Sequence, residues 1–107
     1  MQQNRFLQNL GLAKRANKAV FGFDDVVKHI SLNDAKAVFI ASDTAENTQK
    51  KITRICGENG VKTVRVPFAS RDIGNASGRK PTAVFTVTDN GFYSLLIRSL
   101  SENGGNA

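Results

Sequence analysis

The sequence has 107 residues, which is the size of one domain and too short for two. Its 15 Lys and Arg outnumber its nine Asp and Glu, and the resulting net charge of +6 attracts polyanions such as nucleic acids. One cysteine and one histidine exclude both a disulfide framework and a Cys/His metal site with the usual number of ligands.

Hydrophobic spacing predicts the elements of the first part of the chain. Phe6, Leu7 and Leu10 have helical spacing, which predicts a first helix that ends near residues 15–17. A brief strand or turn is expected at residues 19–22. The helix expected next has the spacing of an amphipathic helix, with apolar side chains at Phe23, Val26, Val27 and Ile30. The continuous apolar run 37–41 then suits a buried central strand.

Capping residues and helix breakers divide the remainder of the chain. Asp43 is followed three residues later by Glu46, as in a capping box, so a helix is predicted to begin near Thr44. This helix should run to Cys56, with Gly57 or Gly60 ending it. A strand at 61–66 stopped by Pro67 and a short helix at 70–76 are expected next. They are followed by a strand at 83–88 that is rich in β-branched residues. Asp89 is expected to cap a last helix, which carries Phe92, Leu95, Leu96 and Leu100.

The alternation of helices and strands predicts the fold class. Such a pattern is typical of layered α/β proteins, and we expect a three-layer α/β/α sandwich with a mixed sheet of about four strands. Residues 1–101 are expected to form this single domain. The segment 102–107 is small and polar, and it is expected to be a flexible C-terminal tail.

The lone thiol and the apolar runs bear on the compartment. Cys56 follows Ile52 and Ile55 in a helical pattern, which indicates a buried structural thiol rather than a nucleophile. Residues 1–10 do not resemble a secretory signal, and no apolar run approaches the length of a membrane span. A free cysteine suits a reducing compartment, so we expect a cytoplasmic protein.

The segment 42–54 is the most informative candidate site. A strand is predicted to end there and a helix to begin, and the first N–H groups of a helix attract anions. The helical spacing gathers a basic and amide-bearing stripe on one face, formed by Asn47, Lys50, Lys51 and Arg54. The cations can neutralise phosphates, and the Asn47 amide offers a donor and an acceptor to a base edge. An ordinary solvated polar face is the alternative interpretation.

Two other basic segments could lie beside this helix. Residues 14–18 carry Lys14, Arg15 and Lys18 at a helix end, where cations also complement the helix dipole without any ligand. Residues 75–81 form a basic loop with Gly78 and Pro81 directly before a strand. The loop has neither the Walker spacing nor a GxGxxG pattern, so it is a weak nucleotide-binding motif.

Several motifs together resemble a known family. In chain order they are Leu10-Gly11-Leu12-Ala13-Lys14-Arg15-Ala16, Val20-Phe21-Gly22, the strand 37–42, Asn47-Thr48-Gln49-Lys50-Lys51, Val66-Pro67, Ser70-Arg71-Asp72-Ile73-Gly74, Gly78, and Val87-Thr88-Asp89-Asn90-Gly91. Their order and spacing, from about residue 6 to 100, are similar to those of the kink-turn-binding ribosomal protein family, the L7Ae class. The small bacterial YlxQ-type branch is the most similar part of that family.

The resemblance implies an α/β/α sandwich that binds kink-turns, which are sharply bent RNA duplexes with tandem sheared G·A pairs. In the family a helix N-terminus reads the guanines, and the pattern Asn-Glu-x-x-Lys falls on Asn47, Thr48 and Lys51. The family's loop over the unpaired nucleotides falls on residues 79–83. The segment that lies against the RNA backbone is matched by Gly11, Lys14 and Arg15.

Two departures from the family pattern change the expected contacts. Thr48 stands where many members have Glu, so a hydroxyl replaces a carboxylate at that contact. The loop Arg79-Lys80-Pro81-Thr82 is also basic and polar, whereas archaeal members are apolar there. This difference favours contact with phosphates over packing on a base. The leading hypothesis is therefore a monomeric binder of structured RNA, ribosomal or regulatory, with no cofactor.

Two other classes of function compete with RNA binding. The first is a protein-interaction module on the same fold with only non-specific RNA affinity. The second is an enzyme, which we do not expect, because the sequence shows no Ser/His/Asp arrangement, metal set or phosphate loop. His29 near a helix end and the acids Asp24 and Asp25 at a helix start are explained by the helix dipole.

Overall fold

The computed structural model describes the backbone of residues 4–105 and the side chains of residues 4–101. Five helices and four strands alternate along this part of the chain, close to the predicted order. They are α1 (Arg5–Arg15), β1 (Ala19–Phe21), α2 (Phe23–Ser31), β2 (Ala37–Ile40), α3 (Glu46–Glu58), β3 (Thr63–Arg65), α4 (Ser70–Ala76), β4 (Val84–Val87) and α5 (Asn90–Gly105).

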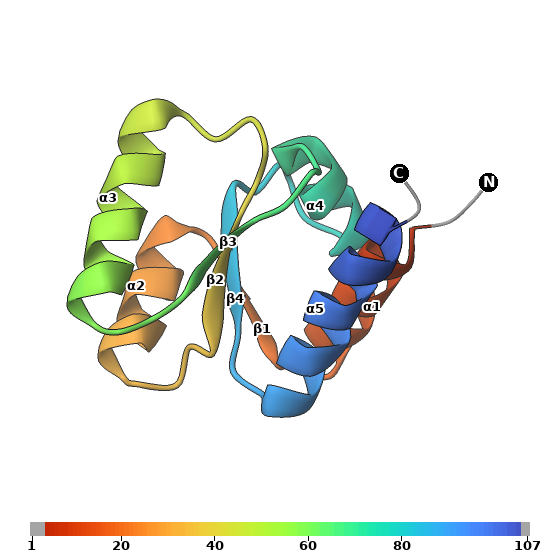
Figure 1. Ribbon diagram of the computed structural model, residues 1–107, viewed down its shortest axis with the longest axis horizontal. Helices are drawn as coiled ribbons and strands as arrows, with labels where there is room; N and C mark the ends of the chain where they lie inside the picture. Colours follow the sequence, from red (N-terminus) through yellow and green to blue (C-terminus); the bar gives the residue numbers. More distant parts are fainter. Residues whose placement is uncertain (1–3, 106–107) are drawn as a thin grey trace.

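The four strands form one mixed sheet in the order β1-β4-β2-β3. β4 pairs antiparallel with both β1 and β2, while β2 and β3 are parallel. The helices α2 and α3 cover one face of the sheet, and α1, α4 and α5 cover the other (Figure 1). The predicted three-layer α/β/α sandwich with a mixed four-stranded sheet is confirmed.

Each face of the sheet has its own hydrophobic core. Alternate residues of β2 point to opposite faces, so Phe39 packs with α1 and its neighbours while Val38 and Ile40 pack with α2 and α3. Phe39 also stacks on Phe85 of β4, with ring centroids 4.9 Å apart. Cys56 is buried in the second core, as expected for a structural thiol. Burial raises the pKa of this thiol to about 11, so it remains protonated at neutral pH.

The start of α3 differs from the prediction. The helix begins at Glu46 rather than near Thr44, and no side chain caps it at Ala45. Asp43 instead accepts hydrogen bonds from the backbone N–H (2.9 Å) and the hydroxyl (3.2 Å) of Ser70, at the start of α4. The Ser70 backbone N–H stabilises the carboxylate and lowers the pKa of Asp43. The predicted capping box was wrong, because the Asp43 carboxylate accepts its hydrogen bonds from Ser70, a residue distant in sequence.

The end of α3 and both ends of α5 can be compared with the sequence predictions. Gly57 lies within α3, and Gly60 follows the helix with a φ of +69°, a left-handed conformation that favours glycine. Asp89 caps α5 as predicted, since its carboxylate accepts from the Phe92 N–H at 3.0 Å. The expected flexible tail at 102–107 begins within α5, whose backbone is helical to Gly105, and residues 106–107 lie outside the described part of the chain.

Candidate nucleic-acid interface

Three helices begin at the same end of the sheet. β1 and β2 run antiparallel to β4, so their last residues lie beside the first residues of β4. β3 is parallel to β2 and ends at the same end of the sheet, one strand further out. Two backbone hydrogen bonds mark this junction: the Gly22 N–H donates to the Val84 carbonyl (2.9 Å), and the Ala41 N–H donates to the Ala83 carbonyl (2.8 Å). The starts of α2, α3 and α4, with their positive dipole ends, follow directly. We call this region the helix-start end of the sheet.

The basic loop 79–82 lies at the helix-start end and is held against α4. The Arg79 N–H donates to the Gly74 carbonyl (2.8 Å), and the Thr82 N–H donates to the Ser70 carbonyl (3.0 Å). The contact with α4 requires glycine, because a Cβ at Gly74 would lie 2.4 Å from the Lys80 carbonyl oxygen. Thr82 is buried and its hydroxyl donates to that same carbonyl at 2.9 Å, so the loop presents its exposed residues, Arg79, Lys80 and Pro81.

The basic stripe on α3 is exposed to solvent. Asn47, Lys50, Lys51 and Arg54 are all exposed, whereas Thr48 is half-buried and Ile52 is fully buried in the core. Two cations of the stripe have carboxylate neighbours one turn away: Lys50 lies 3.5 Å from Glu46, and Arg54 lies 3.7 Å from Glu58. Exposed pairs of this kind contribute little to stability, so both cations remain accessible to another anion.

A hollow between α3 and the end of β3 adds a cation that the sequence did not single out. It has a volume of about 700 Å³ and is lined by Thr44, Glu46, Gln49, Lys50, Thr53, Arg54 and Arg65. We call it the α3–β3 hollow. Arg65 reaches it from β3, and its guanidinium Nη2 donates to the Ser42 carbonyl at 3.3 Å. Asn47 and Lys51 do not line this hollow.

A second basic hollow lies beside β1, at the other edge of the sheet. It has a volume of about 410 Å³ and is lined by Lys14, Asn17, Ala19, Val20, Phe21, Asp25, Lys28, His29 and Arg79. We call it the β1 hollow. The Arg79 guanidinium lies over the Phe21 ring, 5.2 Å from its centroid, which directs this arginine toward β1. The predicted site residues Lys14 and Arg79 therefore meet here, and Lys28 joins them.

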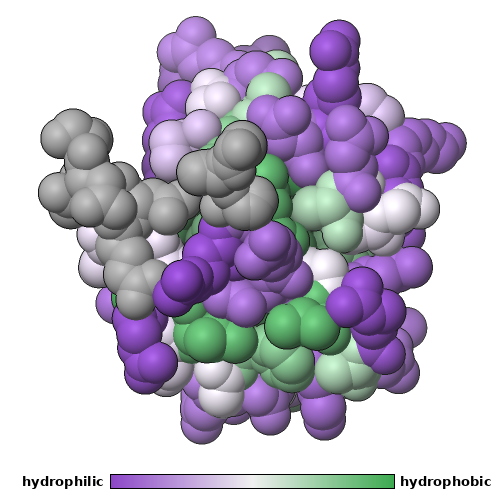
Figure 2. Space-filling view, turned by 90° about the vertical axis from the view of Figure 1, so that its right-hand side faces the viewer, coloured by the Kyte–Doolittle hydropathy of each residue, from purple (hydrophilic) through white to green (hydrophobic). Residues whose placement is uncertain are grey.

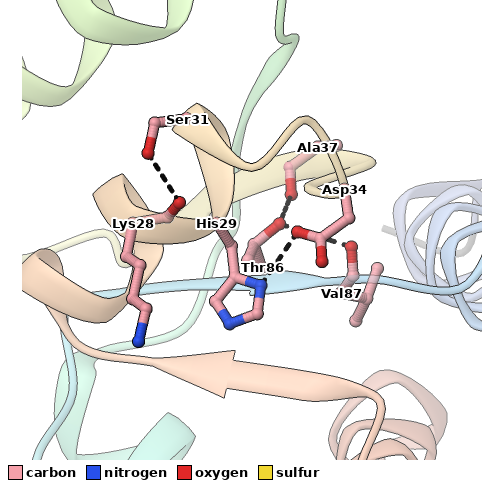
Figure 3. Close-up of polar contacts among 7 residues, drawn as sticks. All are labelled: Lys28, His29, Ser31, Asp34, Ala37, Thr86 and Val87. Atoms are coloured by element: carbon pink, nitrogen blue, oxygen red, sulfur yellow. Dashed lines mark hydrogen bonds and ion pairs between the residues drawn. The ribbon is translucent and has the colours of Figure 1, made fainter.

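His29 contributes a structural contact to the β1 hollow. Figure 3 shows the side chains of Lys28 and His29 extending side by side from α2 toward β1. The His29 Nδ1 atom lies 2.8 Å from a carboxylate oxygen of Asp34, which holds the ring against the segment after α2. The imidazole is thus engaged by a neighbouring acid, a contact that the interpretation of His29 by the helix dipole did not include.

The remaining predicted residues lie on α1. Gly11 is buried where α1 crosses α4, and a Cβ there would lie 3.0 Å from the Ala76 carbonyl oxygen. Arg15 lines a groove of about 610 Å³ between α1 and α4, together with Asp72 and Asn75. The structure therefore assigns Gly11 to helix packing and separates Arg15 from the β1 hollow.

The described part of the chain also bears on metal binding and on membrane insertion. Among the described side chains, those of residues 4–101, no group of three or more His, Cys, Asp or Glu is arranged to hold a metal ion. Over the same residues, no helix is both long and apolar enough to span a membrane.

Replacing Gly74 by Ala tests the support of loop 79–82. The added methyl group would overlap backbone atoms of Lys80, so the loop must shift, and we expect a loss of about 1–3 kcal/mol in the free energy of unfolding. Urea denaturation measures this loss. Gly57→Ala is the control, because its Cβ would meet nothing within 4 Å. That exposed helical position should gain about 0.5–1 kcal/mol. A Gly74→Ala variant as stable as the wild type would show that the loop does not pack on α4.

Relatives of known sequence match most of the chain. The chain is 41% identical over 92 residues to the RNA-binding protein YlxQ of Bacillus subtilis (strain 168). The matched region covers 85% of this chain and 90% of that protein. It is 37% identical over 83 residues to the RNA-binding protein YlxQ of Enterococcus faecium, covering 78% of this chain and 79% of that protein.

Solved structures share the fold. A protein of unknown function from Bacillus halodurans C superposes with a TM-score of 0.84 at 29% identity, covering 92% of this chain and 99% of that one. The Giardia lamblia 15.5kD RNA binding protein has the same fold, with a TM-score of 0.72 at 18% identity, covering 92% of this chain and 83% of that one.

A family model defines the relationship most directly. The model of the ribosomal protein L7Ae/L30e/S12e/Gadd45 family matches residues 4–97, which confirms the resemblance inferred from the sequence motifs. The chain therefore belongs to the ribosomal protein L7Ae/L30e/S12e/Gadd45 family.

Proposed function

We propose that this protein binds structured RNA at the helix-start end of its sheet. The observation that carries the proposal is the position of loop 79–82, which α4 fixes at the meeting point of three helix starts. Arg79 and Lys80 are exposed there, beside positive dipole ends, so the region attracts phosphates. The names of the two YlxQ relatives describe them as RNA-binding proteins, which supports the same function for this chain.

The proposed target is a bent RNA with tandem G·A pairs. Asn47 lies in the first turn of α3, exposed, where its amide can pair with a base edge while Lys51, one turn later, contacts the backbone. Thr48 offers only a hydroxyl at the neighbouring contact. Lys50 and Arg54 supply phosphate contacts, and the exposed part of loop 79–82 covers the nucleotides of the bend. Shape recognition of this kind is the usual mode for structured RNA.

The residues of α1 have two separate roles in this proposal. Lys14 neutralises phosphate in the β1 hollow together with Arg79, and Arg15 neutralises phosphate from the α1–α4 groove. Gly11 acts indirectly, since its lack of a side chain lets α1 approach α4, the helix that supports the loop. We further propose that the protein acts as a cytoplasmic monomer on ribosomal or regulatory RNA, without a cofactor and without catalysis.

A protein-interaction module on the same fold is the competing function. On the face formed by α1, α4 and α5, hydrophobic side chains gather in a limited area among hydrophilic ones (Figure 2). In the described part of the chain, the large hydrophobic side chains exposed to solvent are Leu12 (44%) and Leu32 (58%). They belong to α1 and to the end of α2, on opposite faces of the sheet, so they do not combine into one apolar docking surface.

The first prediction separates base reading from phosphate contact. Binding is measured at fixed salt to a kink-turn duplex and to a duplex whose G·A pairs are changed. Asn47→Ala should narrow the difference in affinity between these RNAs by about 1–3 kcal/mol, because it removes a contact to bases. Lys50→Ala should weaken both RNAs similarly, because phosphates carry no sequence information. Equal binding of both RNAs by the wild type contradicts kink-turn specificity, and unchanged discrimination in Asn47→Ala contradicts its role.

The second prediction concerns the β1 hollow. The double variant Lys14→Gln/Arg79→Gln removes two proposed phosphate contacts, so the slope of log affinity against log salt should fall by about 1.5. The matched control is Lys36→Gln/Lys62→Gln, which removes the same charge at the other end of the sheet. There the Lys36 N–H donates to the Val87 carbonyl, and the Lys62 carbonyl accepts from the Val38 N–H. Thermal unfolding checks that both variants fold. Similar slopes in the two variants would exclude the β1 hollow from the interface.

A further inference from the structure

We propose that the α3–β3 hollow is a second RNA-backbone site, in which Arg54 and Arg65 hold phosphates of one helical arm of the bent RNA. The inference rests on the proposed function and extends the interface to the far edge of the sheet. It adds Arg65, a residue of β3, to the RNA-binding set. The β1 hollow would then hold the other arm, with loop 79–82 between the two.

The charges in the α3–β3 hollow favour an anionic ligand. Three cations line it, Lys50, Arg54 and Arg65, against the single carboxylate of Glu46. That carboxylate lies 3.5 Å from Lys50, and both side chains are more than 70% exposed, so solvent screens the pair. Arg65 contacts no carboxylate among the described residues and is oriented by the Ser42 carbonyl, which leaves its other N–H groups for a phosphate.

The neutral lining of the α3–β3 hollow suits a nucleic-acid backbone. The side chains between the cations are Thr44, Gln49 and Thr53, whose hydroxyl and amide groups can hydrogen bond to phosphate and sugar oxygens. The Thr44 hydroxyl donates to the Ala41 carbonyl at 2.8 Å, so this wall of the hollow is fixed to the end of β2. Cations interspersed with hydroxyl and amide groups suit contact with an RNA backbone.

The positions of the two hollows indicate a polymeric ligand. β1 and β3 are the two edges of the sheet, and β4 and β2 lie between them. Three strand spacings separate the edges, which is about 14 Å. One phosphate group therefore cannot occupy both hollows, whereas the backbone of a bent duplex can pass from one to the other. The loop that precedes the central strand β4 lies between them, where the bend would sit.

The test uses the double variant Arg54→Gln/Arg65→Gln in the full chain. The probes are a bent duplex with tandem G·A pairs and two helical arms, and two shortened duplexes that each lack one arm. We expect affinity for the two-armed RNA to fall about tenfold and the salt slope to fall by about 1.5, since two phosphate contacts are lost. One of the shortened RNAs should bind the variant and the wild type equally, because the arm that reaches the hollow is missing from it.

Control variants distinguish the possible failures. Lys50→Gln/Arg54→Gln keeps the hydrogen bond of Arg65 to Ser42 and should lose comparable affinity if phosphate binding is the cause. If Arg54→Gln/Arg65→Gln binds all three RNAs as Lys36→Gln/Lys62→Gln does, this inference is overturned. The proposed function would survive that result if Lys14→Gln/Arg79→Gln still weakened binding. Wild-type protein without salt-dependent RNA affinity would overturn both, and tighter capture of an acidic peptide than of RNA would replace RNA as the ligand.

Discussion

β4 runs antiparallel to both of its neighbours, β1 and β2, and hydrogen bonds to both of them. This pairing makes β1, β2 and β3 end together, so the helices α2, α3 and α4 all begin beside the first residues of β4. The loop that leads into β4 must therefore pass between the helix starts. Strand direction therefore brings positive dipole ends and basic loop residues together in one place. The hydrophobic cores on both faces of the sheet stabilise this arrangement of strands.

Local packing then determines which groups of this region face a ligand. The absence of a side chain at Gly74 lets the loop backbone lie directly on α4, and Thr82 turns inward, so Arg79 and Lys80 turn outward. Asp43 is engaged by Ser70 and does not cap α3. No side chain caps α3 at Ala45, and the one acidic residue of its first turn, Glu46, lies 3.5 Å from Lys50.

The sequence predicted the helices and strands well, but it could not predict the tertiary contacts around the candidate site. The periodicity of apolar residues located the helices and strands, because each element buries apolar side chains on one face or on two. On β2, for example, Phe39 and Val38 are buried on opposite faces of the sheet. It could not show that Ser70 takes the carboxylate of Asp43, since that contact joins segments 27 residues apart. Arg65 was missed for a similar reason: it approaches α3 only because β3 pairs with β2 in parallel. The motif match assigned Gly11 to the segment that lies against RNA, and the sequence could not show that Gly11 is buried where α1 crosses α4.

Chemical-shift mapping can show whether RNA contacts the helix-start end of the sheet. Isotope-labelled protein is titrated with a kink-turn duplex while backbone amide signals are followed by NMR. We expect the largest shifts at residues 41–47 and 79–83. Shifts confined to α5 and to the opposite end of the sheet, near Lys36 and Thr88, would contradict this contact.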